Sequence, residues 1–122
     1  MASSKEIAEN SLFGKMVTGK ISCEKVYEDD YCIVIKDISP VAPVHLLILP
    51  KHAVYSVSCL SNDSEQDKTA MGYIMTIIPR IASILQIKSY RLVINEGEQA
   101  QQNIGYLCIH LIGGRELAWP PA

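Results

Sequence analysis

One long amphipathic segment divides this chain in two. From Glu65 to Gln86, apolar side chains recur at the three- and four-residue spacing of a helix face. Pro79 lies inside this segment and has no backbone N–H, so we expect a kink or break there. The apolar positions of this face are Ala70, Met71, Ile74, Ile77, Ile78, Ile81 and Leu85.

Extended segments flank this helix on both sides. Residues 25–35 predict a β-hairpin, and the apolar run at 45–49 predicts a strand covered on both faces. Residues 90–94 and 104–112 predict two further strands. Strands on both sides of one helix indicate an α+β fold with a mostly antiparallel five-stranded sheet, which we expect to form a single domain over residues 1–122.

The N-terminal segment predicts one short helix. Ser3 and Ser4, followed by Glu6, are typical of a helix start, and Gly19 is a suitable end. Between them an apolar stripe is formed by Leu12, Phe13, Met16 and Val17.

Composition excludes several classes of function. The net charge of -2 and pI near 5.9 exclude a basic surface for nucleic acid. No apolar run reaches the ~18 residues of a membrane span, and the polar N-terminus is no signal peptide, so we expect a cytoplasmic protein. The cysteines have no metal-site spacing, and we expect reduced thiols, no cofactor and no metal. They are Cys23, Cys32, Cys59 and Cys108.

The last predicted strand carries the first candidate site. With a period of two, Tyr106, Cys108 and His110 share one face, while the residues between them are apolar and should face the core. A phenol, a thiol and an imidazole in a row could act together in chemistry. Packing inside a half-buried strand is the alternative explanation for this pattern.

Two further places could bind an anionic ligand. The loop after Asn95 offers the amides of Gln102 and Asn103, which could contact phosphate oxygens without net charge. Asp37 follows a predicted strand, and its carboxylate could accept hydrogen bonds from a ribose diol. The alternatives are a solvated surface loop and an Asp that caps a turn.

Seven short segments spread along the chain form a recognisable set of motifs. They are Ser11–Lys15, Tyr27–Asp30, Asp37–His45, Leu49–Lys51, Asn95–Gly97, Leu111–Arg115 and Trp119–Pro121. In this order they resemble the histidine-triad family, and most of all its nucleotide-binding branch, the purine nucleoside phosphoramidases. The resemblance covers nearly the whole chain.

This resemblance implies a homodimer whose subunits join their sheets, with one nucleotide site in each subunit. It implies a ribose contact for Asp37, and a place for Trp119 in shaping the neighbouring subunit's site. The purine slot would be lined by Leu12, Phe13, Met16 and Ile35. The phosphate would lie near Asn95, Gln102 and Asn103.

The chain departs from the family where the chemistry takes place. The family signature is His-φ-His-φ-His-φ-φ, with φ apolar, and its central imidazole attacks phosphorus to form a covalent intermediate. Here Tyr106 and Cys108 replace the first two histidines, while His110 and the separate upstream His45 are present. A thiol near its usual pKa of ~8.5 is mostly un-ionised at pH 7, although a neighbouring His110 could lower that pKa.

Three functions are therefore compatible with the sequence. The first is a purine nucleotide-binding protein with weak or absent phosphoramidase activity. The second is an active hydrolase or transferase of nucleoside phosphoramidates or related esters, with Cys108 as the nucleophile and His110 and His45 beside it. The third is a dimeric protein-interaction module.

Overall fold

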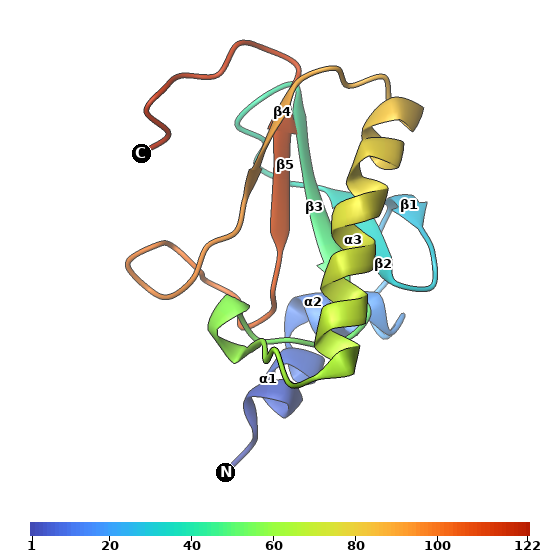
Figure 1. The fold of residues 1–122 in the computed structure, drawn as a ribbon, viewed down its shortest axis with the longest axis vertical. Coiled ribbons are helices and arrows are strands. Elements are labelled where there is room, and N and C mark those ends of the chain that lie inside the picture. The colour runs from blue at the N-terminus through green and yellow to red at the C-terminus, as the bar shows by residue number, and fades with distance from the viewer.

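A five-stranded sheet forms the centre of the molecule, and its helices lie on both faces (Figure 1). The computed structural model describes residues 1–122. In chain order the elements are α1 (Ser4–Asn10), α2 (Leu12–Val17), β1 (Lys25–Glu28), β2 (Cys32–Lys36), β3 (Val44–Pro50), the 3-10 turn η1 (Val57–Cys59), α3 (Glu65–Ile84), β4 (Tyr90–Val93) and β5 (Ile109–Gly113). The sheet order is β1-β2-β3-β5-β4 and every pair is antiparallel, which confirms the predicted α+β class.

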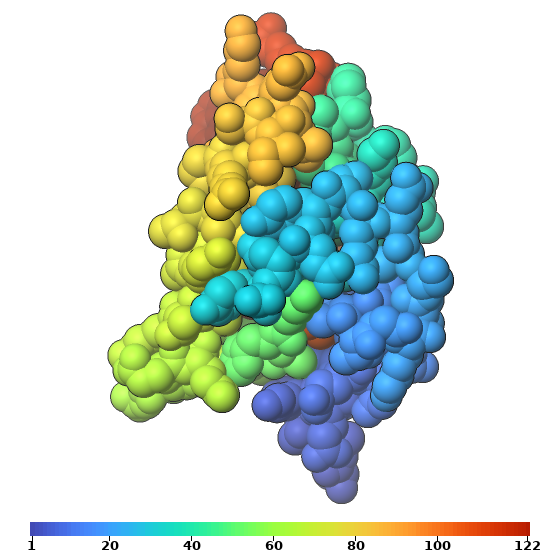
Figure 2. All heavy atoms as spheres, turned by 90° about the vertical axis from the view of Figure 1, so that its right-hand side faces the viewer, coloured from blue at the N-terminus to red at the C-terminus, as the bar shows by residue number.

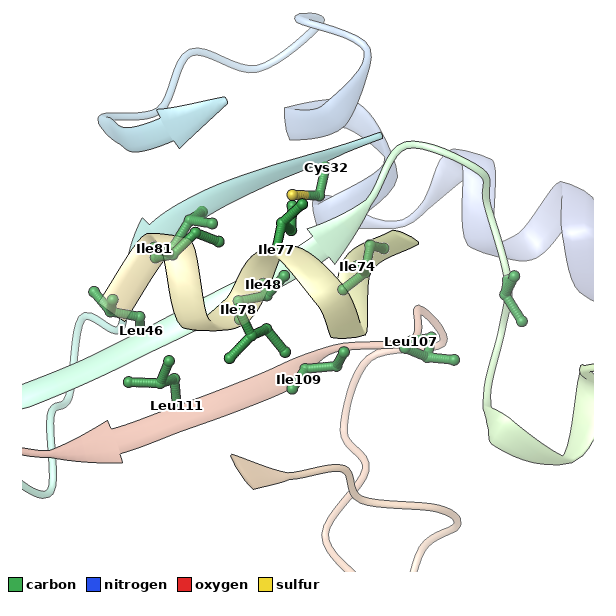
Figure 3. Packing of buried hydrophobic residues seen from close by; sticks show 12 residues of the cluster. Cys32, Leu46, Ile48, Ile74, Ile77, Ile78, Ile81, Leu107, Ile109 and Leu111 are labelled. Atoms are coloured by element: carbon green, nitrogen blue, oxygen red, sulfur yellow. The ribbon is translucent and has the colours of Figure 1, made fainter. Parts of the chain in front are cut away.

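Helix α3 covers one face of the sheet with isoleucines. Ile74, Ile77, Ile78 and Ile81 point from α3 toward the sheet, as Figure 3 shows. They meet side chains of β2, β3 and β5 in a cluster that contains no charged group. The sheet side of this cluster includes Cys32, Val34, Leu46, Ile48, Leu107, Ile109 and Leu111. The alternation predicted for the last strand therefore holds for its apolar side.

The opposite face is covered by the N-terminal helices. Figure 2 shows α3 and the N-terminal segment on opposite sides of the β1–β2 hairpin. Ala8 of α1 is fully buried there, against Ile33 of β2 and Leu49 of β3. Phe13 and Met16 of α2 pack on the edge of this second cluster. These helices cover only one end of the face (Figure 1).

The single N-terminal helix predicted from the sequence is wrong: there are two, α1 and α2. Ser11 separates them in an extended conformation, and its hydroxyl donates to the Ala8 carbonyl (2.7 Å) while accepting from the Gly14 N–H (3.1 Å). A Cβ at Gly14 would lie 2.2 Å from the Ala8 carbonyl oxygen, so α2 can turn this closely on α1 only with glycine there. The continuous apolar stripe concealed this break.

The predicted break at Pro79 is also wrong, because α3 continues through it to Ile84. Pro79 lies on the exposed side of the helix, where the carbonyl that loses its partner can hydrogen-bond to water. The helix ends slightly earlier than predicted. Gln86 adopts a left-handed conformation, and the Ile87 N–H donates back to the Ala82 carbonyl (2.8 Å), which is a Schellman ending.

The last strand is shorter than the predicted 104–112. Ile109 pairs with Ile48, and two residue pairs further the ladder would reach the end of β3 at Pro50, which has no N–H. The Leu107 N–H donates instead to the Val54 carbonyl at 2.7 Å. Residues 104–108 therefore approach β5 as an irregular segment.

None of the helices combines the length with the hydropathy that a membrane span requires.

Candidate functional site

The sheet register brings three polar side chains together. Leu47 lies opposite His110, and His45 lies opposite Ile112, so the two histidines are diagonal neighbours on the same face. Asp37 follows β2 directly, and its N–H donates to the His45 carbonyl (3.0 Å), which places it across from His45. Asp37 and His45 flank the short loop between β2 and β3, whereas His110 is 65 residues beyond His45. The antiparallel pairing of β3 with β5 brings His110 to the other two.

Hydrogen bonds order this cluster into a chain. The Val41 N–H donates to Nδ1 of His45 at 3.2 Å. Nδ1 is thus an acceptor, and the proton of the neutral His45 ring lies on Nε2. That Nε2 is 2.9 Å from Nδ1 of His110 and 3.4 Å from Oδ2 of Asp37.

The donor-to-acceptor direction of these hydrogen bonds shows which ring nitrogen of His110 carries the proton. Since Nε2–H of His45 donates, Nδ1 of His110 accepts, and the remaining proton of His110 lies on its Nε2. Burial lowers the pKa of His110 most; repulsion from His45, which would arise if both rings were protonated, acts in the same direction, and Asp37 acts in the opposite one. At neutral pH His110 is therefore a neutral ring with a hydrogen-bond donor left for a ligand.

Cys108 lies beside this cluster as a neutral thiol. Burial, and then the negative charge of Asp37, raise the pKa of Cys108 to about 12. This shift is opposite to the lowering by His110 that we considered from the sequence. A thiol with such a pKa is a poor nucleophile at neutral pH, because the thiolate is the reactive form.

Tyr106 is not presented on an open face as the strand alternation predicted. It is 1% exposed, belongs to the buried cluster under α1, and donates its hydroxyl proton to the Pro50 carbonyl. Burial raises the pKa of Tyr106 well above its ordinary value. The phenol therefore forms the floor of the site and holds no free donor for a ligand.

A cavity of about 150 Å³ lies over these residues. Most of its polar lining comes from uncharged groups, and Asp37 is its only carboxylate. It is lined by Phe13, Asp37, Leu47, Asn95, Gln101, Gln102, Asn103, Ile104, Tyr106, Cys108 and His110. The sequence had not marked Leu47 or Ile104, since buried apolar residues carry no chemical signal.

A second cavity of about 390 Å³ adjoins the first through Asp37. Met16 and Ile35, both predicted for a purine slot, line it together with the backbone segment before β1. Its other lining residues are Ser22, Cys23, Glu24, Lys36 and Ile38. Asp37 is the one site residue that faces both cavities.

The side-chain amides of residues 95–103 have different roles. The Gln102 side chain is tied to the protein: its Oε1 accepts from the Gly97 N–H (3.1 Å), and its Nε2 donates to the Tyr55 carbonyl (2.8 Å). Asn95 and Asn103 line the same cavity, and neither amide makes a hydrogen bond within the chain. Gln102 therefore holds the loop, whereas the two asparagines have donors available.

Three predicted residues lie outside both cavities. One is His45, which is buried behind them and reaches them only through its hydrogen bond to His110. Leu12 is 46% exposed on α2 and is absent from both linings. Trp119 is 78% exposed in the C-terminal segment, where the Arg91 guanidinium lies 5.6 Å from its ring centre. Neither Leu12 nor Trp119 contributes to the site of its own chain.

Asp37, His45 and His110 also have the donor types of a metal site, and their ligand atoms all lie within 4.8 Å of one another. Two imidazoles and a carboxylate would suit a divalent transition metal. In this arrangement, however, Nε2 of His45 carries the proton of the hydrogen-bond chain, and a metal ion there would have to displace it.

Comparison with known proteins identifies the family. The HIT domain model matches residues 18–117. Protein pkiA of Dictyostelium discoideum is 50% identical over 113 residues, covering 92% of this chain and 89% of that protein. A HIT family hydrolase from Legionella pneumophila is 34% identical with a TM-score of 0.84, over 93% of this chain and all of that one. A histidine triad protein from Clostridium difficile is 29% identical with a TM-score of 0.79, over 88% and 92% of the two chains. The chain thus belongs to the HIT domain family, as its sequence motifs predicted.

Proposed function

We propose that this protein binds a purine nucleotide across the two adjoining cavities, with weak or absent turnover. The observation that carries the proposal is the position of Asp37, which lines both cavities. A ribose lies between the base and the phosphate of a nucleotide, and its diol suits a carboxylate acceptor. The base would then occupy the apolar cavity beside Met16 and Ile35, and the phosphate would lie near His110.

Neutral donors support binding of the phosphate. His110, Asn95 and Asn103 line the smaller cavity, which contains no lysine or arginine, and each has a side-chain N–H without a partner in the chain. Backbone and side-chain dipoles can hold an anion without a fixed positive charge. This mode of binding agrees with a chain whose net charge is -2.

Weak turnover follows from the residue at the nucleophile position. The similar Legionella protein is named a hydrolase, but in this chain the central position of the triad is Cys108, whose thiol has a pKa raised to about 12. Attack on phosphorus needs an available lone pair of sufficient nucleophilicity. A nucleoside phosphoramidate would therefore bind here and react very slowly.

A homodimer in the cytoplasm completes the proposal. β4 is an edge strand, with one side paired to β5 and the other free to pair with a second copy. The exposed Trp119 is available to reach the neighbouring subunit's site. The four free cysteines fit a reducing compartment.

Calorimetric titration with adenosine monophosphate, adenosine and adenine tests the proposal. We expect Asp37→Ala to weaken the two ribose-containing ligands by about 1.5–3 kcal/mol, because it removes a charged hydrogen-bond acceptor. Adenine should be nearly unaffected. Asp30→Ala, which removes an exposed carboxylate outside the cavities, is the matched control. Equal losses for adenine and adenosine would show that Asp37 is not the ribose ligand.

A further inference from the structure

The loop between β2 and β3 rests on very few contacts. Ile38 is fully exposed and Val41 is 57% exposed, so apolar burial does little to hold residues 38–43. The loop makes three hydrogen bonds: the Ser39 N–H donates to Oδ1 of Asp37 (2.7 Å), and Val41 uses both its N–H and its carbonyl. The two hydrogen bonds of Val41 therefore hold this loop in position more than any other contact.

Val41 is held from two sides. Its N–H donates to Nδ1 of His45, and its carbonyl accepts from Nη2 of Arg115 at 3.0 Å. A second guanidinium nitrogen, Nη1, donates to the Glu116 carbonyl at 2.9 Å, which fixes the orientation of the Arg115 fork. One exposed arginine after β5 is thus linked through a single residue to the hydrogen-bond chain of the site.

The turn after β5 is built to bring Arg115 to this loop. Gly114 has a φ of +86°, and a Cβ there would lie 3.0 Å from Cβ of Pro43 and 3.2 Å from the Val44 nitrogen. Only glycine fits this conformation and this close approach without strain. The start of the C-terminal segment and the end of the loop lie together at the same end of the sheet (Figure 1).

We propose that Arg115 is a positioning residue of the site: by holding the Val41 carbonyl, it keeps the Val41 N–H on His45 and so keeps His110 as a donor toward the ligand. The guanidinium makes no hydrogen bond to a residue that lines the smaller cavity, and it is linked to the site through Val41 and His45. The consequence for phosphate binding rests on the proposed function, whereas the consequence for the two imidazoles does not.

Loss of the Arg115 contact should reverse the hydrogen-bond chain. Without the Val41 N–H, Nδ1 of His45 can carry the ring proton, and its Nε2 becomes an acceptor facing Nδ1 of His110. The lone pairs on Nε2 of His45 and Nδ1 of His110 would then repel each other. This repulsion is removed when the proton of His110 moves from its Nε2 to its Nδ1. Its Nε2 would present a lone pair to the ligand, which repels phosphate oxygens instead of binding them.

Nitrogen-15 NMR of the imidazole rings shows which nitrogen of each ring carries the proton, and it can be recorded on the ligand-free protein. We expect wild type to show His45 and His110 each protonated at Nε2, with His52→Gln used to assign the signals. Arg115→Ala should give a mixture of tautomers at both rings. Arg115→Lys, which retains one donor, should restore most of the wild-type pattern, and Lys88→Ala is the matched loss of an exposed cation. Unchanged tautomers in Arg115→Ala would overturn the proposal, as would an equal change in Lys88→Ala.

Thermal unfolding shows whether the Arg115 variants are folded, so that a change of tautomer can be distinguished from loss of the fold. If Arg115→Ala is unfolded, Arg115→Met keeps the apolar stem of the side chain and takes its place in the same spectra. For ligand binding, we expect Arg115→Ala to weaken adenosine monophosphate about tenfold, as for one charge-assisted hydrogen bond, and to leave adenosine nearly unchanged. A tautomer change in a protein that binds neither ligand would refute the proposed function and leave the role of Arg115 standing.

Discussion

The two faces of the sheet are built in different ways. Under α3, isoleucines from one helix meet aliphatic side chains from three strands, and no charged group enters the layer (Figure 3). The opposite face has an apolar end under α1 and α2 and a polar end that holds Asp37, His45 and His110. The first face therefore depends on how much apolar area is buried, whereas the second depends on where single hydrogen bonds lie.

This difference predicts that substitutions on the two faces will affect different measurements. Removing methylene groups under α3 should lower the free energy of unfolding with little effect on ligand binding. Changing a polar group on the site face should alter chemistry or binding while the fold persists. Two predictions test this separation, and a third tests an ion pair at the start of α3 that belongs to neither face.

The largest effect is expected from Ile78→Ala. Ile78 is 2% exposed in the α3 layer, and the cavity left by this substitution should reduce the free energy of unfolding by about 2–5 kcal/mol. Urea denaturation measures this loss, and nucleotide affinity in the folded protein should not change. Ile84→Ala, at a position that is 57% exposed on the same helix, is the control and should cost less than about 1 kcal/mol. Equal losses at the two positions would contradict the importance of this layer.

An intermediate effect is expected from Cys108→His. A neutral imidazole is a better nucleophile than an un-ionised thiol, so hydrolysis of a purine nucleoside phosphoramidate should rise about tenfold or more, which equals about 1.4 kcal/mol in activation free energy. Cys59→His places the same residue at an exposed position outside the cavity and should have no effect.

The behaviour of Cys108→Ala decides the alternative mechanism. If wild type has substantial activity that both Cys108→Ala and Cys108→His lose, and if alkylation of Cys108 blocks it, the thiol is a nucleophile. The site face would then carry a different chemistry and not a weakened one.

The smallest effect concerns Asp67 near the start of α3. The His52 imidazole, 2.6 Å away, and then the Ser61 N–H lower the pKa of Asp67. Because the folded-state pKa is depressed, this carboxylate contributes stability above its unfolded value of about 3.9, and the contribution is lost as the pH falls through the folded-state value.

Denaturation at several pH values tests this contribution. Asp67→Asn should be less stable than wild type at pH 7, and the difference should shrink below about pH 4. Asp63→Asn, at a neighbouring exposed position, should show no such trend. A difference between Asp67→Asn and wild type that stays constant with pH would contradict an electrostatic origin.

Much of the fold could be predicted because its signals are local. The spacing of isoleucines predicted α3, and short apolar runs predicted the strands, with errors of a few residues at their ends. The errors at Ser11 and at residues 104–108 both come from hydrogen bonds that the apolar pattern does not show. At Ser11 the side chain bonds to the nearby backbone of Ala8 and Gly14, and at Leu107 the N–H bonds to the distant Val54 carbonyl. Periodicity reports which side of a segment is apolar, and it does not report where the backbone changes partners.

The candidate site divides along the same line. The residue types at the triad positions, the place of Asp37 after a strand and the motifs of the HIT family can all be read from the amino-acid order. The folded chain was needed to show that Tyr106 is buried under α1, that Gln102 holds its own loop, and that Arg115 is linked to His45 through Val41. The physical reason is that the residue type alone fixes which functional group a side chain carries. Where that group's proton lies, how deeply it is buried and which hydrogen-bond donors it has free depend on groups that the fold brings from elsewhere in the chain.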